Sequence, residues 1–288
     1  MSIENNKVVF LHMPKTGGGA MRYLFYDETK KIRRNYMFNL NGYDDSKYYN
    51  DGKSFNHGSG SNSELIHQNP KKVEEYKNHQ HFKECKLIFG HVSFSFGELF
   101  PEYNFEYITV VREPIIRALS NIIQFAPSDG NMVRIGNNSE VCKNCEVGSK
   151  KYWDFIYELL SNYPIEGIMV HNNHGLTNCQ TRVFQGVKYD NIDEEVDLDK
   201  AIENSKHIHY SFFNNFNEGL QRSFDLTNIP IDMSKNKKAS KGLPSSQKDK
   251  QKVMGEYYGA DKKIIDLVKE LNDKDIKLYE YLTKNPKV

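Results

Sequence analysis

Residues 7–19 read KVVFLHMPKTGGG, an apolar run that passes directly into a proline and three glycines. The valines and the phenylalanine predict a buried β-strand over Lys7–Leu11. The proline and the glycines predict a tight loop. Beyond Gly19, apolar residues recur at helical spacing as far as Tyr26, which predicts a helix. We therefore expect a unit of strand, glycine-rich loop and helix.

A second unit of this kind follows later in the chain. Phe105–Val111 predicts a strong strand, and Pro114 opens a helical pattern in the first turn, where its missing N–H is tolerated. Further strands are predicted at Lys86–Gly90 and His207–Phe212. Strands that alternate with helices predict a three-layer α/β fold with a central, mainly parallel β-sheet flanked by helices. Ligands of such sheets bind at the carboxyl ends of the strands, where both loops are expected.

The remaining segments are expected to belong to the same single domain, residues 1–288. Residues 29–64 and 127–150 are polar with little hydrophobic periodicity, and they predict variable loop insertions. Residues 235–252 predict a basic, serine-containing loop. Further helices are predicted at Glu74–Phe82, Tyr152–Leu160, Cys179–Phe184, Phe216–Phe224, Lys252–Tyr258 and Asp261–Leu282.

Composition excludes several classes of protein. The chain carries 39 Lys and Arg against 38 Asp and Glu, a net charge of +1, which argues against a nucleic-acid partner. Its apolar stretches are strand-sized, so no membrane span is predicted. The four cysteines, Cys85, Cys142, Cys145 and Cys179, are too few and too irregular for a disulfide scaffold. Cys142 and Cys145 form one CxxC without a second ligand pair, so free thiols or one local disulfide are favoured over a metal.

The glycine-rich loop has the chemistry of an anion site. Glycines let successive backbone N–H groups point at an anion, the following helix adds a partial positive charge, and Lys15 adds a full one. Lys15 precedes the glycines, and no serine follows to bind Mg²⁺, so the loop departs from the Walker pattern GxxxxGK[ST] of ATPases. The alternative is a Pro-Gly turn with a solvated lysine. The flanking strand and helix favour the anion site.

Two motifs together resemble a known family. HMPKTGG at residues 12–18 and VREPIIRALS at residues 111–120 resemble the two cofactor loops of the sulfotransferases that use 3'-phosphoadenosine 5'-phosphosulfate (PAPS). The chain is most similar to the glycan branch, which includes the heparan sulfate 2-O- and 6-O-sulfotransferases. Weaker similarity extends through GHVS at 90–93, NCQTR at 178–182 and residues 237–244. The expected fold is accordingly a P-loop-like form of the three-layer arrangement.

The resemblance implies a set of cofactor-binding residues. The backbone of Thr16, Gly17, Gly18 and Gly19 and the Thr16 hydroxyl would hold the 5'-phosphosulfate. Lys15 would neutralise charge on the leaving phosphate. Arg112 and Ser120 would hold the 3'-phosphate, to which a guanidinium is well suited. The alternatives are a surface salt bridge of Arg112 with Glu113 or another acid and a plain helical role for Ser120. Arg117 is expected to pair with Glu113 or, more simply, to be structural.

His91 is the candidate general base of the resemblance, because it follows a predicted strand in the GHVS context. An imidazole accepts a hydroxyl proton near neutral pH. The related enzymes often have His-Gly-His, whereas Phe89 holds the first position here. The alternative is that His91 hydrogen-bonds the backbone at a strand end. His12, beside the loop, is expected to support loop geometry.

The basic loop at 235–252 has two interpretations. The resemblance implies that it covers the cofactor, with Ser240 and Lys241 nearest to a phosphate, and its charge would also steer a polyanionic acceptor. The alternative is a solvated charged segment. The Asn178–Arg182 segment is expected to provide packing or acceptor contacts.

The function expected from these residues is transfer of a sulfuryl group from PAPS, without a metal, to an acceptor hydroxyl, foremost of a carbohydrate. His91 and Lys15 would be catalytic. A P-loop nucleotide kinase or NTPase and a non-catalytic nucleotide- or sulfated-glycan-binding protein are the alternatives. The polar N-terminus lacks the apolar core of a secretory signal, which favours a cytoplasmic enzyme. As a truncated eukaryotic chain it would be Golgi lumenal, as many of the related enzymes are.

Overall fold

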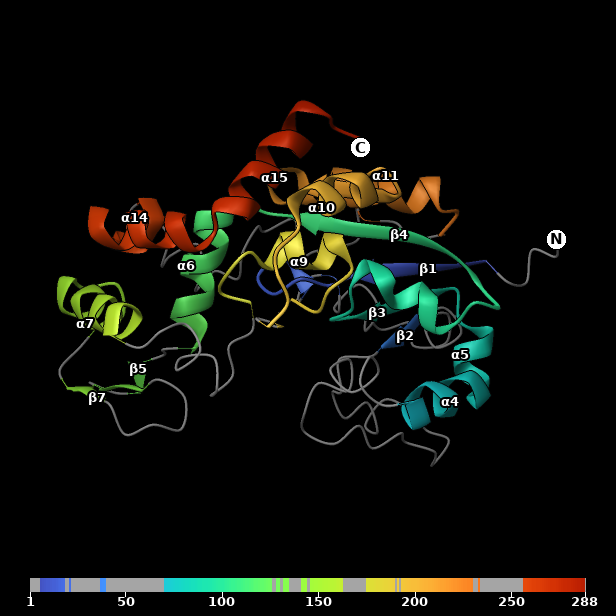
Figure 1. Ribbon diagram of the computed structural model, residues 1–288, viewed down its shortest axis with the longest axis horizontal. Coiled ribbons are helices and arrows are strands. Elements are labelled where there is room, and N and C mark those ends of the chain that lie inside the picture. Colours follow the sequence, from blue (N-terminus) through green and yellow to red (C-terminus); the bar gives the residue numbers. More distant parts are fainter. Residues whose placement is uncertain are drawn as a thin grey trace.

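The computed structural model of the chain describes residues 6–18, 21, 37–39, 70–125, 128–129, 132–134, 141–143, 146–162, 175–189, 191, 193–229, 233 and 256–287. These residues form an α/β protein with a parallel sheet and surrounding helices (Figure 1). The helices are α4 (Pro70–Asn78), α5 (Gln80–Glu84), η3 (Phe94–Leu99), α6 (Pro114–Phe125), α7 (Lys150–Asn162), α9 (Cys179–Gln185), α10 (Leu198–Ser205), η4 (Phe213–Asn215), α11 (Phe216–Leu226), η6 (Glu256–Gly259), α14 (Lys262–Leu271) and α15 (Asp273–Lys284).

The central sheet contains the four strands predicted from the sequence and one more. Its strands are β1 (Asn6–Leu11), β2 (Met37–Asn39), β3 (Leu87–Gly90), β4 (Asn104–Val111) and β8 (Ile208–Phe212). Their spatial order is β2-β3-β1-β4-β8, and every neighbouring pair is parallel. The α/β class and the parallel sheet are thereby confirmed. The prediction of an uninterrupted loop over residues 29–64 is wrong at β2, a short strand that pairs only with β3.

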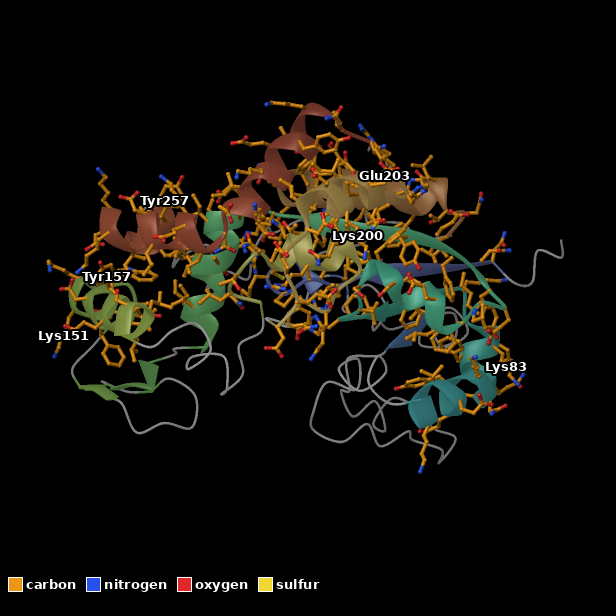
Figure 2. All side chains as sticks on the ribbon, viewed as in Figure 1. Lys83, Lys151, Tyr157, Lys200, Glu203 and Tyr257 are labelled. Carbon is orange, nitrogen blue, oxygen red and sulfur yellow. The ribbon has the colours of Figure 1, made fainter. Side chains whose placement is uncertain are left out.

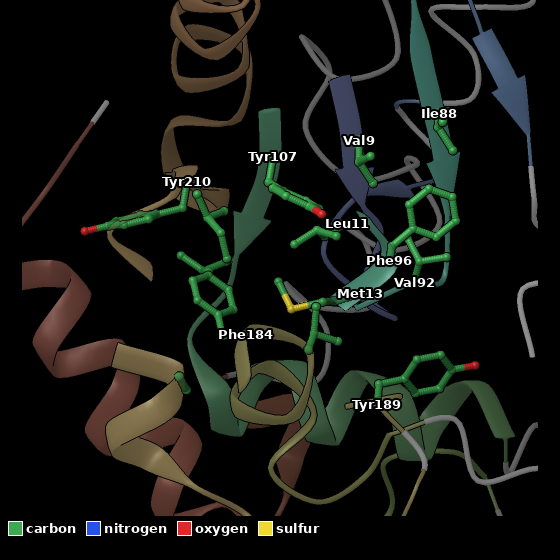
Figure 3. Close-up of a cluster of buried hydrophobic side chains, with 14 of the residues drawn as sticks. Val9, Leu11, Met13, Ile88, Val92, Phe96, Tyr107, Phe184, Tyr189 and Tyr210 are labelled. Atoms are coloured by element: carbon green, nitrogen blue, oxygen red, sulfur yellow. The ribbon is translucent and has the colours of Figure 1, made fainter. Parts of the chain in front are cut away.

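The sheet is buried on both faces, and alternate residues of β1 enter two separate cores. Val9 and Leu11 belong to a cluster that also contains residues of η3, α9, α10 and α15 (Figure 3). Val8 and Phe10 belong to a second cluster with residues of α11. Strands buried on both faces are near-continuous apolar runs. The VVFL run of β1 is such a run, and its burial could therefore be predicted from the sequence.

A third core lies beside the sheet, among α6, α7 and α14. Trp153 of α7 is 1% exposed and packs with buried residues of the other two helices. At the start of α6, the Glu113 carboxylate accepts hydrogen bonds from the backbone N–H groups of Ile115 (3.2 Å) and Ile116 (2.6 Å). Glu113 therefore satisfies N–H groups that a helix start leaves without partners.

The C-terminal helices differ from their prediction. The single helix expected over Asp261–Leu282 is two helices, α14 and α15, which meet at the fully buried Asn272. The Asn272 Oδ1 accepts hydrogen bonds from the Asn178 backbone N–H (3.1 Å) and from Arg117 (3.3 Å). The helix is thus interrupted at Asn272, whose buried side-chain amide binds α6 through Arg117 and the start of α9 through Asn178. The helix expected over Lys252–Tyr258 is also wrong in its described part, because two residues of η6 have left-handed backbone torsions.

Other segments complete the architecture. Residues 127–150 contain a small antiparallel sheet of β5 (Ser128–Asp129), β6 (Met132–Arg134) and β7 (Val141–Lys143). The sequence did not predict α10, whose Lys200 and Glu203 are exposed (Figure 2). Gly19, Cys145, most of the helix predicted after Gly19, and the basic loop with Ser240 and Lys241 lie outside the described residues. In the described part of the chain, every helix is too short or too polar to cross a membrane.

Candidate functional site

Three neighbouring strands deliver the sequence-predicted site residues to one edge of the sheet. β1 lies between β3 and β4 and is parallel to both, so the three strands end at the same edge. Leu11, the last residue of β1, is in register with Gly90 of β3 and Thr109 of β4. The glycine-rich loop, His91 and Arg112 therefore leave the sheet side by side.

The loop after β1 has an unusual backbone. Lys15 has a φ of 69° and Gly17 a φ of 96°, both in the left-handed region. Thr16 is fully buried between them, and its hydroxyl donates to the Met13 carbonyl at 2.8 Å. The Thr16 proton therefore closes the turn, whereas the resemblance implied that it would bind phosphate. The first helical bond follows at once, from the Met21 N–H to the Gly17 carbonyl at 3.1 Å.

Two cations meet on this loop. Nη1 of Arg112 donates to the Lys15 carbonyl at 3.0 Å, which joins the end of β4 to the loop after β1. Burial, with the positive charge of Arg112 as a second cause, lowers the pKa of Lys15 to about 8. Burial also lowers the pKa of Arg112. Both shifts disfavour the charged forms, as expected where a half-buried and a buried cation lie together.

The described hydrogen-bond partners of Arg112 carry no formal charge. Its backbone exchanges two hydrogen bonds of 2.9 Å with the Gln180 side chain. Its Nη2 donates to the Tyr258 hydroxyl at 3.1 Å, and its guanidinium lies 4.5 Å from the centre of the Phe213 ring. The Tyr258 carbonyl in turn accepts a 3.1 Å bond from the Trp153 indole.

The salt-bridge alternative for Arg112 is therefore not found. The residue is only 4% exposed. Among the ion pairs within the described ranges, none involves its guanidinium. Glu113 instead caps α6 through backbone N–H groups. Arg112 is therefore a buried arginine whose guanidinium, among the described residues, donates to a carbonyl and a phenol.

His91 has a defined tautomer in this arrangement. Its Nδ1 lies 2.7 Å from the His12 carbonyl oxygen. A carbonyl oxygen only accepts hydrogen bonds, so Nδ1 must carry the proton. The lone pair of the neutral ring is then on Nε2, the atom that a general base uses. The backbone hydrogen bond that was the alternative for His91 is present, and it is compatible with a role as base.

The other sequence-predicted residues lie farther from this cluster or are structural. Ser120 is buried on α6 at 5% exposure, and the described residues show no hydrogen bond between it and Arg112. Arg117 is fully buried and pairs with Asp275 at 3.7 Å, not with Glu113. Its structural role is confirmed.

The Asn178–Arg182 segment packs against α15. The Asp275 carboxylate accepts hydrogen bonds from the backbone N–H groups of Gln180 (3.1 Å) and Thr181 (2.7 Å) and from the Thr181 hydroxyl (2.8 Å). These bonds satisfy the first turn of α9, as a helix start requires. The packing interpretation of this segment is supported by these contacts.

Sequence reasoning missed the residues that hold Arg112. Gln180 was part of a quoted motif, but nothing marked its side chain as a partner of a backbone 68 positions away. Tyr258 lay in a segment predicted as a helix, and Phe213 followed a predicted strand. One signal could have indicated Phe213. It directly follows β8, and β8 lies beside β4 and ends at the same edge of the sheet as Arg112.

No group of His, Cys, Asp or Glu side chains suited to a metal ion occurs within the part of the chain that the structure covers. A comparison with known proteins found neither a family model nor a curated protein that matches this chain.

Proposed function

We propose that the protein is a PAPS-dependent sulfotransferase that acts on a hydroxyl group, foremost of a carbohydrate, and that its sheet belongs to a three-layer P-loop-like fold. The observation that carries the proposal is the contact between Lys15 and Arg112 at the carboxyl edge, beside an imidazole with its lone pair on Nε2. The paired motifs at residues 12–18 and 111–120 contribute the two halves of that contact.

The residues present fit a ligand with two anionic ends. Lys15 is half-buried, Arg112 is buried, and both have lowered pKa values, so an anion that binds both would stabilise their charged forms. Arg112 uses two of the five donor hydrogens of a guanidinium in its bonds to Lys15 and Tyr258. Helix N-termini also attract anions through their N–H groups. The bound donor would supply an activated sulfuryl group on a phosphate leaving group.

In the proposed site, each residue has a separate task. Lys15 and the backbone N–H groups of residues 16–19 bind the 5'-phosphosulfate, and the ammonium group neutralises charge where the leaving group departs. Arg112 binds the 3'-phosphate together with Ser120. Ser240 and Lys241 of the basic loop remain predicted contacts. These groups mainly position the reactants and balance charge.

His91 accepts the proton of the acceptor hydroxyl on Nε2. The Nδ1–H bond to the His12 carbonyl leaves Nε2 as the basic atom, and the imidazole is partly exposed at the edge of the sheet. As the proton leaves, the hydroxyl oxygen becomes nucleophilic enough to attack in line with the leaving group. The positive charge that develops on the imidazole stays beside the polar carbonyl of His12.

The test measures binding and transfer separately. Calorimetry with 3'-phosphoadenosine 5'-phosphate (PAP), the desulfated donor, should show binding that Arg112→Met weakens strongly. Labelled sulfate from PAPS should then move to members of a panel of sugars, tyrosyl peptides and small alcohols. His91→Ala should stop transfer and spare PAP binding, whereas His207→Ala, at an exposed histidine outside the site, should change neither.

Three outcomes would favour the alternatives. A wild-type protein that fails to bind PAP would overturn the proposal. Turnover of ATP with Mg²⁺ in a parallel assay would indicate a kinase or NTPase. Tight PAP binding without transfer to any acceptor of the panel would indicate a binding protein.

A further inference from the structure

A stack of rings runs from the interior of the sheet to His91. Phe10 stacks on Phe89 at 5.4 Å between ring centroids, Phe89 on His12 at 4.8 Å, and His12 on His91 at 4.2 Å. The planes of His12 and His91 differ by 22°. The rings alternate between β1 and β3 or the residues that follow them, so the rigid part of the sheet continues into the site. Tyr189 contacts the far end, 5.3 Å from His91.

His12 also touches the glycine-rich loop. A Cβ atom on Gly18 would lie 1.6 Å from Nε2 of His12, far inside van der Waals contact. The imidazole therefore occupies the space that any other residue at position 18 would need. Gly18 is 7 residues from the end of β1 along the chain, yet its backbone limits one side of the His12 ring. The His12 ring also stacks on Phe89 and on His91.

We propose that His12 is the positioning residue of His91: its carbonyl selects the Nδ1–H tautomer, and its ring, wedged against Gly18, fixes the plane of the His91 ring. This inference rests on the proposed role of His91 as the base. The hydrogen bond from Nδ1 to the His12 carbonyl fixes one atom of the imidazole and does not by itself fix the plane of the ring. Stacking at 4.2 Å removes this freedom, so Nε2 keeps one direction. A misdirected or wrongly protonated imidazole loses most of its value as a base.

The arrangement gives Gly18 a second task. The sequence predicts that the backbone of Gly18 binds an anion. Because Gly18 has no side chain, it also leaves room for the His12 ring. A methyl group at position 18 must push the His12 ring toward His91 or out of the stack. The cofactor loop and the base are thereby coupled through one imidazole. Gly18→Ala should disturb His91 although the two residues are not neighbours in sequence.

The decisive experiment observes the imidazole nitrogens of His91 by ¹⁵N NMR without any ligand, at a pH where the ring is neutral. Wild-type protein should show a protonated Nδ1 and an unprotonated Nε2, in one fixed tautomer. His12→Ala and Gly18→Ala both keep the His12 carbonyl but lose the correct ring contact, so the His91 ring can turn away from that carbonyl. The two nitrogen shifts should then move toward each other as the tautomers begin to exchange. His207→Ala is the matched control and should leave the His91 shifts unchanged. A wild-type His91 protonated on Nε2 would refute the proposal even if neither variant folds.

Kinetics provide the second readout. Removal of the His12 ring should lower kcat roughly tenfold to a hundredfold, the scale expected for a misplaced catalytic group. The KM for the acceptor should change by less than about threefold, because substrate contacts remain. If His12→Ala leaves both kcat and the His91 shifts unchanged, the ring has no positioning role. If wild-type protein transfers no sulfate but shows the expected shifts, the proposed function fails while the positioning of His91 stands.

Discussion

Two buried arginines, five positions apart, are used in opposite ways. Arg117 lies on α6, is fully buried, and pairs with the Asp275 carboxylate at 3.7 Å. Arg112 lies at the end of β4, is 4% exposed, and bonds to a carbonyl and a phenol. A buried charge needs compensation. The Asp275 carboxylate compensates the charge of Arg117, whereas the described hydrogen-bond partners of Arg112 are neutral, and Glu113 acts on it through its charge without an ion pair.

The charge of Arg117 is structural, whereas the proposed function gives the charge of Arg112 a role in binding. Arg117 also donates to the Gly175 carbonyl at 2.7 Å, so one side chain ties α6 to α15 and to the segment before α9. The Arg112 guanidinium uses two donor hydrogens within the described residues, and in the proposed site the remaining ones bind the ligand. Both arginines occur in the same motif, so only their surroundings distinguish the two roles. A substitution at the Arg117–Asp275 pair should therefore change mainly the free energy of unfolding, and a substitution of Arg112 should change mainly ligand binding.

The largest effect is expected at the structural junction. Asp275→Ala removes the carboxylate that Arg117, Gln180 and Thr181 share. Loss of one partner of a buried ion pair leaves the other charge uncompensated, and unfolding should require roughly 3–5 kcal/mol less. Urea denaturation measures this change through the midpoint at a constant m-value.

Asp273→Ala is the control for that change. Asp273 is two residues away, and its side chain is 44% exposed and pairs with Lys277 at 3.4 Å. Surface pairs of this kind contribute at most about 1 kcal/mol. If the two aspartates prove equally expendable, the junction around Arg117 does not hold the helices together.

At the other arginine, stability and binding should change separately. Arg112→Met removes hydrogen bonds from a charged donor to an anion, each of which contributes roughly 1.5–3 kcal/mol. Calorimetric PAP binding should weaken by at least that amount, while the free energy of unfolding changes by less than about 1 kcal/mol. Arg222→Met, at an exposed position of α11, should alter neither quantity. A strong loss of stability in Arg112→Met would make the two arginines alike and end the distinction.

The pH dependence of binding should identify Lys15 as the second cation. Its pKa of about 8 reflects burial first and the nearby Arg112 charge second. Anion binding favours the ammonium form, so PAP affinity should be full below about pH 8 and fall by up to tenfold per pH unit above it. Lys15→Arg should lack this decline, since a guanidinium stays charged. Calorimetry from pH 7 to pH 9.5 makes the comparison.

The same shift has a consequence for stability without ligand. The folded protein releases the Lys15 proton near pH 8, whereas the unfolded chain holds it to about 10.5. The unfolded state therefore binds more protons between these values, and the free energy of unfolding should gain from this group as pH rises through that window. Lys15→Arg should lack this gain, because a guanidinium keeps its proton in both states. A change of stability with pH that wild-type protein and Lys15→Arg have in common comes from other groups.

Much of the fold was readable from local patterns. The VVFL run of β1, the LIF run of β3 and the end of β4 are mostly apolar and buried, and such runs mark strands buried on both faces. β2 was missed because its three residues give no period to detect. The helix break at Asn272 was missed for a different reason. Asn is tolerated in a helix, and only its bonds to Arg117 and Asn178, which are distant in sequence, explain the break.

The site was predictable where its residues follow strands. Lys15, His91 and Arg112 each follow or end a predicted strand, and parallel strands bring such positions together. The contacts that give each residue its character come from elsewhere in the chain. Stacking of His12 on His91 and the bonds of Gln180 and Tyr258 to Arg112 require the folded arrangement. Patterns in a single sequence describe neighbours along the chain, so they cannot predict contacts between residues this far apart in sequence.

The smallest expected effect concerns the residue that holds Arg112 from the side of α14. Tyr258→Phe removes the hydroxyl that accepts from Nη2 of Arg112, but leaves the carbonyl that binds Trp153. Loss of one hydrogen bond is worth about 0.5–1.5 kcal/mol. PAP affinity should fall by roughly threefold to tenfold, because Arg112 is then held less firmly, and transfer should fall with it.

Tyr257→Phe is the matched control, since it removes a phenol one residue away in the same left-handed turn (Figure 2). It should leave PAP affinity within about twofold, because the partner of Arg112 remains. Titration calorimetry of both variants at pH 7 compares them directly. Equal losses in the two variants would mean that the turn as a whole, and not the hydroxyl of Tyr258, orients Arg112. An unchanged affinity in Tyr258→Phe would mean that the Lys15 carbonyl and the Phe213 ring suffice to hold the guanidinium.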